Sequence, residues 1–408
     1  MAAKTQTLRF ERSIAAPINQ VYQAFTNSVS LREWLSDSAE FQAKQDGVVC
    51  LYWYDGRFVV GRYTKLEKDK LVRMNWQSSF GPQSEQMVQV DFKKNGDQTA
   101  LTLAHSGLEA GENGQEDIAS IKKDWESSLD NLKSVLETGI DQRLFKRPMI
   151  GILIDRLINA EIASKEGLPV DHGLELSGVI DGMGAAELSM GDGTIITSLN
   201  DIKITNYQDI SEAIGNKQAG DVVSATYYMN GQEHQGELKL SARPQAEVPA
   251  TPQGLAESAT QIYGKINDKL DELFQGASAQ AAELKPAVDE WSAREVVAHL
   301  IAHEQHLAYW GAALERAKGR VSYSANSHQL VAAIANAYPN MAALREGLEQ
   351  AQKQNVAFLA GLPVEFVARK GSYHRLAQNF LEENKHHAKG HFDQIVAALE
   401  NAKESIAG

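Results

Sequence analysis

The chain has 408 residues, of which 43% are hydrophobic and 23% are charged, proportions that are typical of well-packed globular proteins. Its length predicts two to four domains rather than one. The formal net charge of −13 argues against a nucleic-acid partner and against docking on anionic membranes, because both need a basic face on the protein.

The cysteine content and the apolar runs indicate in which cellular compartment the protein is expected. The single cysteine, Cys50, excludes an intrachain disulfide and zinc sites built from cysteine. The start, MAAKTQTLRF, lacks the apolar core of a signal peptide. The longest strongly apolar run, MIGILI, is too short to cross a bilayer. We therefore expect a cytoplasmic protein without a membrane segment.

Residues 1–140 have the pattern of a strand, a short helix, several β-like stretches and a long final helix. The alternation in TLRFERSIAA predicts the first strand, and Pro17 opens the helix PINQVYQAFTN. The letters NGD between two alternating runs predict a hairpin. Apolar residues at helical spacing predict the long helix over 116–139. This order predicts an α+β domain whose curved sheet wraps around the last helix.

This first segment is similar to a known family. The stretches IAAPINQVYQAFTNSVSLREWL and TALTLAHSG, with the Trp-bearing long helix, resemble the Hsp90-ATPase-activator-homologue branch of the START-like (SRPBCC) helix-grip proteins. The resemblance implies a cavity between sheet and helix that takes a small hydrophobic ligand, or a surface that docks a protein client. Four tryptophans would line such a cavity or, alternatively, belong to an ordinary aromatic core: Trp34, Trp53, Trp76 and Trp125.

Residues 141–243 resemble a PDZ domain of the HtrA type, from RPMIGILID through GELKL. In that family a glycine-bearing loop and the next strand receive a peptide's C-terminal carboxylate on backbone N–H groups, and the peptide adds to the sheet edge. The same module can equally serve as an intramolecular spacer. No Ser–His–Asp unit accompanies it, which argues against an HtrA-like protease. The resemblance assigns the peptide-binding loop to Met149, Ile150, Gly151 and Ile152.

A linker and an all-helical segment complete the predicted organisation. The Pro- and Ala-rich stretch SARPQAEVPATPQG contains the expected linker, 244–254. Residues 255–408 repeat apolar residues at helical spacing, and Ser292 followed by Glu295 has the capping-box pattern of a helix start. The run SYHRLAQNFLEENKHHAKGHFDQIVAALENA predicts one further helix. The number of helical runs and their short connections predict a four-helix bundle.

Eight of the eleven histidines fall in this helical segment. His387 and His391 are four residues apart, so both imidazoles project from one helix face within reach of one ion. His386 lies about a hundred degrees around the same helix and is predicted to be a bystander. A bundle site needs a further ligand from another helix. The run AHLIAHEQH offers three candidates on one face, but it is not the metalloprotease motif HExxH: His299, His303 and His306.

The stretches EWSAREVVAHL and HHAKGHFDQI resemble the DinB-like (DinB/YfiT) superfamily. The resemblance assigns His299, His387 and His391 as ligands of a divalent metal ion. Three neutral imidazoles with open positions are a catalytic type of site, and ligation by nitrogen alone suits Zn²⁺ or Ni²⁺. Glu295 and Glu383 each precede a proposed ligand by four residues. They would orient its other ring nitrogen or, alternatively, be ordinary surface carboxylates.

Two functions are compatible with these patterns. In the first, a metal-activated water, or a small thiol bound as a metal thiolate, carries out hydrolysis of, or transfer to, a small hydrophobic molecule. The family resemblance favours the thiol route. In the second, the chain is a non-enzymatic adaptor, in which the START-like and PDZ-like parts bind an apolar ligand, a peptide or a protein client. The metal would then only stiffen the bundle.

Overall fold

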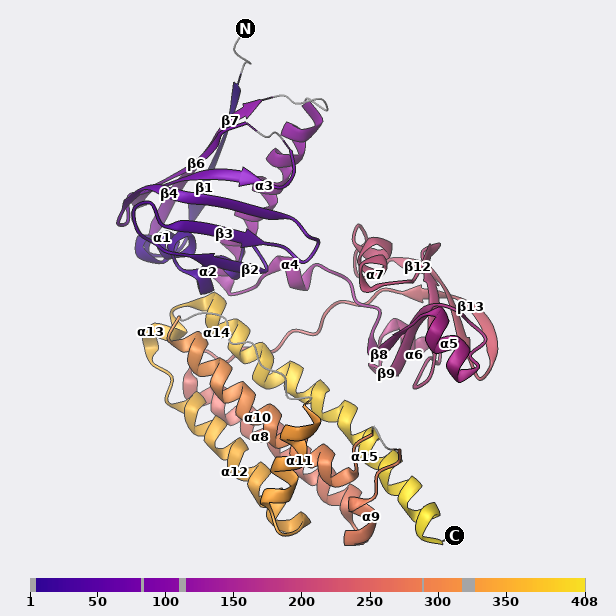
Figure 1. Ribbon diagram of the computed structural model, residues 1–408. Helices are drawn as coiled ribbons and strands as arrows, with labels where there is room; N and C mark the ends of the chain where they lie inside the picture. Colours follow the sequence, from indigo (N-terminus) through magenta and orange to yellow (C-terminus); the bar gives the residue numbers. More distant parts are fainter. Residues whose placement is uncertain (1–4, 82–83, 110–114, 288–289, 318–326, 408) are drawn as a thin grey trace. The chain divides into compact units, whose positions relative to one another are not determined.

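The computed structural model describes residues 5–81, 84–109, 115–287, 290–317 and 327–407 (Figure 1). Residues 1–4, part of the start considered for a signal peptide, lie outside this range. The chain divides into two compact units: Met1–Asp141 with Ala246–Lys385 and His391–Gly408, and Gln142–Gln245 with His386–Gly390. No helix within the described residues has the length and apolarity needed to cross a membrane.

The N-terminal domain is an antiparallel sheet packed against a long helix, as predicted. The sheet has the strand order β1-β7-β6-β5-β4-β3-β2, and the helix α3 spans Gln115–Thr138. Two short helices, α1 (Ile18–Thr26) and α2 (Ser28–Arg32), follow the first strand. The strands are β1 (Thr5–Ile14), β2 (Ser38–Phe41), β3 (Val48–Tyr52), β4 (Phe58–Glu67), β5 (Leu71–Ser78), β6 (Gln86–Asn95) and β7 (Gln98–Glu109).

Local sequence signals explain much of this domain. Asn95 pairs with Gln98 across the tight turn between β6 and β7, which confirms the hairpin predicted from NGD. On β7 the residues at every second position are buried, so one face of the sheet meets the core. On α3, Trp125, Leu129 and Leu132 are buried at spacings of four and three, which forms one apolar stripe. Sheet and helix thus share a single hydrophobic core.

The second unit contains a smaller antiparallel sheet with the order β13-β12-β10-β9-β8, and β11 pairs with β10. Strand β8 therefore lies at the sheet edge in the described part of the chain. The strands are β8 (Ile152–Ile158), β9 (Gly173–Val179), β10 (Ile195–Leu199), β11 (Ile202–Lys203), β12 (Val222–Met229) and β13 (Gln232–Lys239). The short helices are α4 (Gln142–Phe145), α5 (Ala160–Glu166), α6 (Gly184–Glu187) and α7 (Tyr207–Ile214).

The C-terminal segment is helical, as predicted. Its long helices are α8 (Pro252–Phe274), α10 (Ala293–Glu315), α12 (Met341–Ala360) and α15 (Asn384–Ala407). Shorter helices connect them: α9 (Ala279–Glu283), α11 (His328–Ala337), α13 (Val364–Val367) and α14 (Lys370–Ala377). A π-helical segment, η1 (Gln378–Glu383), joins α14 to α15. The single helix predicted from Ser372 onward is thus continuous but changes its winding before α15.

The linker is held against the bundle at two points. The backbone N–H of Ala246 donates to the side-chain oxygen of Gln378 at 2.8 Å, and the Tyr373 hydroxyl donates to the Pro249 carbonyl at 2.9 Å. Helix α8 then begins at Pro252, with Thr251 as its N-cap. The first helix therefore starts three residues before our predicted boundary at 255, because Pro is favoured at the first helical position.

The N-terminal domain and the bundle belong to the same compact unit and meet at α14. Ser372 donates its hydroxyl to the buried carboxylate of Glu33, and Lys370 donates to the Glu137 carbonyl at 2.6 Å. A Cβ on Gly371 would lie 2.7 Å from both Glu33 Oε2 and Val135 Cγ1. The close approach of α14 therefore requires glycine at this position.

Candidate metal centre

The first part of the site comes from helix α10. Ser292 caps the helix by accepting from the Glu295 backbone N–H, while the Glu295 side chain accepts from the Ser292 backbone N–H. This confirms the predicted capping box, which fixes where the helix starts. His299 follows two turns later and is only 1% exposed. Its imidazole is therefore directed into the bundle rather than into solvent.

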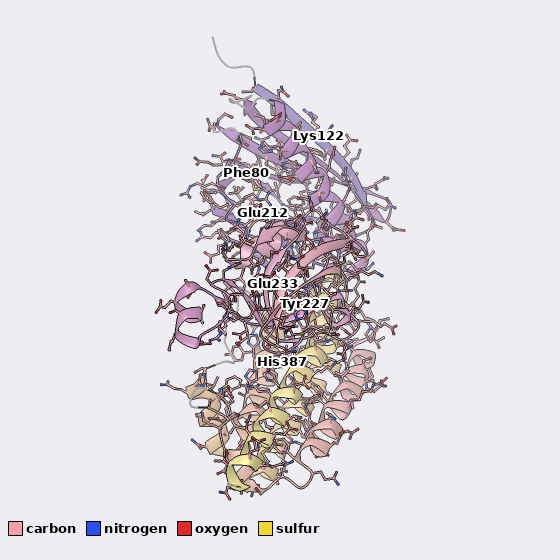
Figure 2. All side chains as sticks on the ribbon, turned by 90° about the vertical axis from the view of Figure 1, so that its right-hand side faces the viewer. Phe80, Lys122, Glu212, Tyr227, Glu233 and His387 are labelled. Atoms are coloured by element: carbon pink, nitrogen blue, oxygen red, sulfur yellow. The ribbon has the colours of Figure 1, made fainter. Side chains whose placement is uncertain are left out.

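Helix α15 supplies the rest of the site. His387, labelled in Figure 2, lies in its first turn, and His391 lies one turn later. One ring nitrogen from each of His299, His387 and His391 lies within 4.8 Å of the other two. Among the residues that the structure describes, this group of potential ligands has three members. The structure thus brings together the three histidines that the sequence predicted.

Two contacts around His391 suit a metal ligand. Its ring lies 4.5 Å from that of His299, at an interplanar angle of 61°. Nδ1 of His391 hydrogen-bonds to Oε1 of Gln394 at 2.9 Å, so Nδ1 carries the proton and Nε2 keeps its lone pair. Burial lowers the pKa of His391. A neutral ring with an oriented, unprotonated nitrogen is the form that binds a divalent metal ion.

Trp291 forms an aromatic cover on the His299 side of the group. Its ring lies 4.8 Å from that of His299 at an angle of 30°. Its indole N–H donates to Nδ1 of His328 at 3.2 Å. No role was predicted for Trp291 or Gln394 from the sequence. The signal for Gln394 was its position three residues after His391, which places both side chains on one helix face.

The other histidines of α10 lie outside the three-membered group. The pKa of His303 is lowered to about 3, first by burial and then by the neighbouring histidines. Burial also lowers the pKa of His306. Both rings are therefore neutral at pH 7. His386, predicted as a bystander, is likewise not a member of the group.

Glu295 and Glu383 make contacts of their own. The Glu295 carboxylate completes the capping box and pairs with Lys285 at 3.0 Å. Glu383 accepts from the side-chain amide of Gln378 at 3.3 Å. These contacts place Glu295 at the helix start, and a role for either carboxylate in orienting a ligand stays a prediction.

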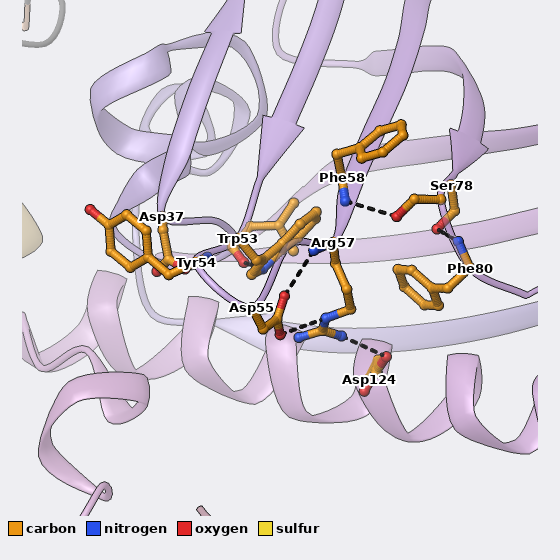
Figure 3. A network of polar contacts seen from close by, with 11 residues as sticks. Asp37, Trp53, Tyr54, Asp55, Arg57, Phe58, Ser78, Phe80 and Asp124 are labelled. Atoms are coloured by element: carbon orange, nitrogen blue, oxygen red, sulfur yellow. Dashed lines mark hydrogen bonds and ion pairs between the residues drawn. The ribbon is translucent and has the colours of Figure 1, made fainter. Parts of the chain in front are cut away.

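The tryptophans proposed to line a cavity in the N-terminal domain belong to its core. Trp34, Trp76 and Trp125 are at most 8% exposed, and partly buried Trp53 packs against the same cluster. The Trp53 ring lies 5.7 Å from the guanidinium of Arg57 (Figure 3). The prediction that these rings line a ligand cavity stays a prediction, and their observed contacts are those of core residues.

The loop predicted to receive a peptide precedes the edge strand β8. Met149 exchanges two backbone hydrogen bonds with Ser241, both of 2.8 Å, and Ile150 is buried. Gly151 has φ +84°, and a Cβ there would lie 2.3 Å from the Cβ of Met183. Ile152 begins β8. Only glycine therefore fits at position 151, whether or not a peptide binds.

Comparison with known proteins finds one family match near each end of the chain. The model of the family described as activator of Hsp90 ATPase homolog 1-like protein matches residues 15–137. The model of the DinB superfamily matches residues 264–395. An HSP90 activator from Plasmodium falciparum is 22% identical, with a TM-score of 0.29, over 32% of this chain and 95% of that one. The Aha1 dimer from Colwellia psychrerythraea is 21% identical, with a TM-score of 0.28, over 32% and 96%.

Curated relatives give a further, weaker similarity. The periplasmic pH-dependent serine endoprotease DegQ of Escherichia coli (strain K12) is 30% identical over 154 residues, which are 36% of this chain and 33% of that protein. The serine protease Do-like HtrA of Lactococcus lactis is 30% identical over 99 residues, which are 23% and 24%. The chain thus spans a third or less of these two relatives. They are only a weak indication of a PDZ domain.

The family matches agree with the fold of the two segments that they cover. The sheet and long helix of the first domain lie within or beside residues 15–137, and the three clustered histidines lie within residues 264–395. The N-terminal domain is therefore similar to activators of Hsp90 ATPase, and the helical region is similar to the DinB superfamily.

Proposed function

We propose that the DinB-like bundle binds a divalent metal ion, Zn²⁺ or Ni²⁺, through His299, His387 and His391, and that the chain is a metal-dependent transferase or hydrolase for a small hydrophobic molecule. The observation that carries the proposal is the convergence of three imidazole nitrogens from two helices within 4.8 Å. DinB-like domains commonly bind a divalent metal ion.

The number of protein ligands favours catalysis. A structural zinc site usually has four protein ligands, whereas a catalytic site has three and leaves a position for water or substrate. The group has three members among the residues that the structure describes. Once bound, such an ion would acidify a coordinated water or a small thiol.

The chain's own residues would then hold and shield the site. Oε1 of Gln394 accepts a hydrogen bond from the Nδ1–H of His391. This contact would keep the ring oriented with Nε2 toward the proposed metal ion. Trp291 lies over the His299 ring and would limit the access of bulk water on that side. His299 is buried on α10, which keeps its ring in a single orientation.

The test compares metal content in three forms of the full chain. We expect one Zn²⁺ or Ni²⁺ per wild-type chain by elemental analysis and by calorimetric titration, and none in His387→Ala/His391→Ala. His386→Ala is the matched control, since it removes a neighbouring imidazole from the same helix and should keep the metal. Equal metal content in all three forms would contradict the site.

The competing function is a non-enzymatic adaptor with a structural metal. In it the N-terminal domain binds a small hydrophobic ligand or a protein client, a function supported by the match of residues 15–137 to the model described as activator of Hsp90 ATPase homolog 1-like protein. The melting temperature separates the two functions. If the double variant loses the metal but melts at the wild-type temperature, a purely structural role of the metal is contradicted. Hydrolysis and thiol-transfer assays on small hydrophobic electrophiles would then identify the reaction.

We further propose that residues 141–243 are a PDZ-like module that binds a peptide C-terminus at Met149–Ile152. The support is an edge strand, β8, that directly follows a loop with a glycine at positive φ. Added strands bind such edges through backbone hydrogen bonds. A library of peptides with free C-terminal carboxylates should yield binders whose affinity is lost on C-terminal amidation. Binding that is insensitive to amidation would contradict carboxylate recognition.

The cytoplasmic setting expected from the sequence stays a proposal as well.

A further inference from the structure

A buried carboxylate joins all four long helices of the bundle. Glu304, in the middle of α10, is 4% exposed and hydrogen-bonds to one residue from each of the other three. The partners are Tyr263 of α8, Asn355 of α12 and Asn384 of α15, which are at most 4% exposed. Burying a carboxylate is costly unless donors satisfy its oxygens. The three donors offset this cost, so the carboxylate ties the four helices together.

The two carboxylate oxygens have separate partners. Oε2 accepts from the Tyr263 hydroxyl at 2.6 Å and from the Asn355 side-chain amide at 2.7 Å. Oε1 accepts from the Asn384 side-chain amide at 3.1 Å. One oxygen therefore holds α8 and α12, and the other holds α15 alone.

Asn384 lies on the same face of α15 as the metal ligands. It precedes His387 by three residues and His391 by seven, and these spacings place the three side chains in one line along a helix. The buried residues Ala388 and Ile395 continue this inward face. A change in the rotation of α15 at Asn384 would therefore move both imidazoles relative to His299.

The helix needs such an anchor because of the segment before it. The π-helical segment η1 ends at Glu383. A π-helix winds more loosely than an α-helix and is frequently found at functional sites. The rotation of α15 is therefore not dictated by a continuous α-helical repeat from α14. Asn384 is the first residue after the segment, so a hydrogen bond there sets the rotation of α15 about its own axis.

We propose that Glu304, through Asn384, is a positioning residue that sets the rotation of α15 and so aligns His387 and His391 with His299. This inference rests on the proposed metal site. It assigns no ligand role to Glu304. Outer partners of metal ligands typically change metal affinity by about ten- to a hundredfold when removed, and the same range is expected here.

The principal test exchanges donor and acceptor across this one hydrogen bond. Asn384→Asp removes the amide N–H that Glu304 accepts and places a second acidic group against its Oε1, so Zn²⁺ affinity should fall by at least about tenfold. Adding Glu304→Gln places an amide N–H opposite the introduced carboxylate and leaves an oxygen for Tyr263 and Asn355. The double variant should recover to within about threefold of wild type, on the same scale. A double variant as weak as Asn384→Asp, or a single variant of wild-type affinity, would overturn the proposal.

A second pair of variants covers the case in which Asn384→Asp does not fold. Asn384→Ala and Tyr263→Phe each remove one donor to Glu304, but only Asn384 lies on the metal-binding helix, where its side chain also hydrogen-bonds to His303. Both should lower the melting temperature of the metal-free protein, whereas only Asn384→Ala should weaken Zn²⁺ binding by at least about tenfold. Equal effects on affinity would reduce Glu304 to a structural role. If wild type itself binds no Zn²⁺ in the same titration, it is the proposed metal site that fails.

Discussion

At the scale of single residues, His105 has its protonation state set by its neighbours. The Trp125 indole N–H can only donate, and it donates to Nδ1 of His105 at 3.0 Å. Nε2 must therefore carry the proton, which it shares with Gln86 Oε1 at 2.8 Å. The ring is buried between this contact and Trp76. Burial lowers the pKa of His105 to about 4, so the folded chain keeps this ring in its neutral form.

This lowered pKa predicts a loss of stability in mild acid. The unfolded chain protonates His105 near pH 6.5, whereas the folded chain resists protonation down to about pH 4. The contribution is thus complete above pH 6.5 and is lost as the pH falls toward 4. Between pH 7.5 and 5 wild type should lose about 2 kcal/mol more of its free energy of unfolding than His105→Gln. Urea unfolding of both proteins at the two pH values measures this difference, and parallel pH slopes would contradict it.

Some residues of the candidate site could be predicted from the sequence, and others could not. The resemblance assigned His299, His387 and His391, because the two motifs that carry it are local in the sequence. Glu304 was not predicted, because a glutamate in a helical run is normally exposed. Its burial depends on three other helices, none of which is visible from the residues around it.

At the scale of elements, local signals predicted boundaries well. The hairpin turn after Asn95 and the capping box at Ser292 depend on four or fewer consecutive residues, so their chemistry is present in the sequence itself. The start of α8 has such a signal too, since Thr251 caps the helix and Pro252 is its first residue, within the stretch predicted as linker.

The π-helical segment was missed for the opposite reason. Residues 372–402 have apolar side chains at helical spacing throughout, and one extra residue in a single turn barely disturbs such a pattern. Its effect is on rotation, which matters only where the helix must present particular side chains. Here these are Asn384, His387 and His391, so the element least visible in the sequence is the one that bears on the site.

At the scale of the whole molecule, contacts between the N-terminal domain and the bundle could not be predicted. Glu33 and Ser372 are 339 positions apart, and each lies in a segment whose resemblance concerns its own fold only. Glu33 is buried, and Arg369 and Arg375 are close enough to act on its charge. Burial outweighs Ser372 and these arginines, and it raises the pKa of Glu33 to about 7.

The raised pKa makes this contact sensitive to pH in the direction opposite to His105. The folded chain keeps the Glu33 proton up to about pH 7, while the unfolded chain releases it near pH 4.5. The stabilising contribution is therefore complete below pH 4.5 and is lost as the pH rises through 7. Between pH 4.5 and 6.5 the contributions of His105 and Glu33 to the free energy of unfolding change in opposite directions and partly cancel. Each contribution is therefore measured as the difference between a single variant and wild type.

We predict that Glu33→Gln, which cannot ionise, gains stability relative to wild type as the pH rises from 4.5 to 8, by at most about 3 kcal/mol. The exposed carboxylate of Glu40 in the same domain supplies the control, because Glu40→Gln removes the same charge without the burial. Guanidinium unfolding of the three proteins at pH 4.5 and 8 measures the effect. A constant difference between Glu33→Gln and wild type would show that Glu33 is ionised in the folded chain and that its contact with Ser372 is an ordinary hydrogen bond to a carboxylate. An equal gain in Glu40→Gln would show that the gain does not come from the burial of Glu33.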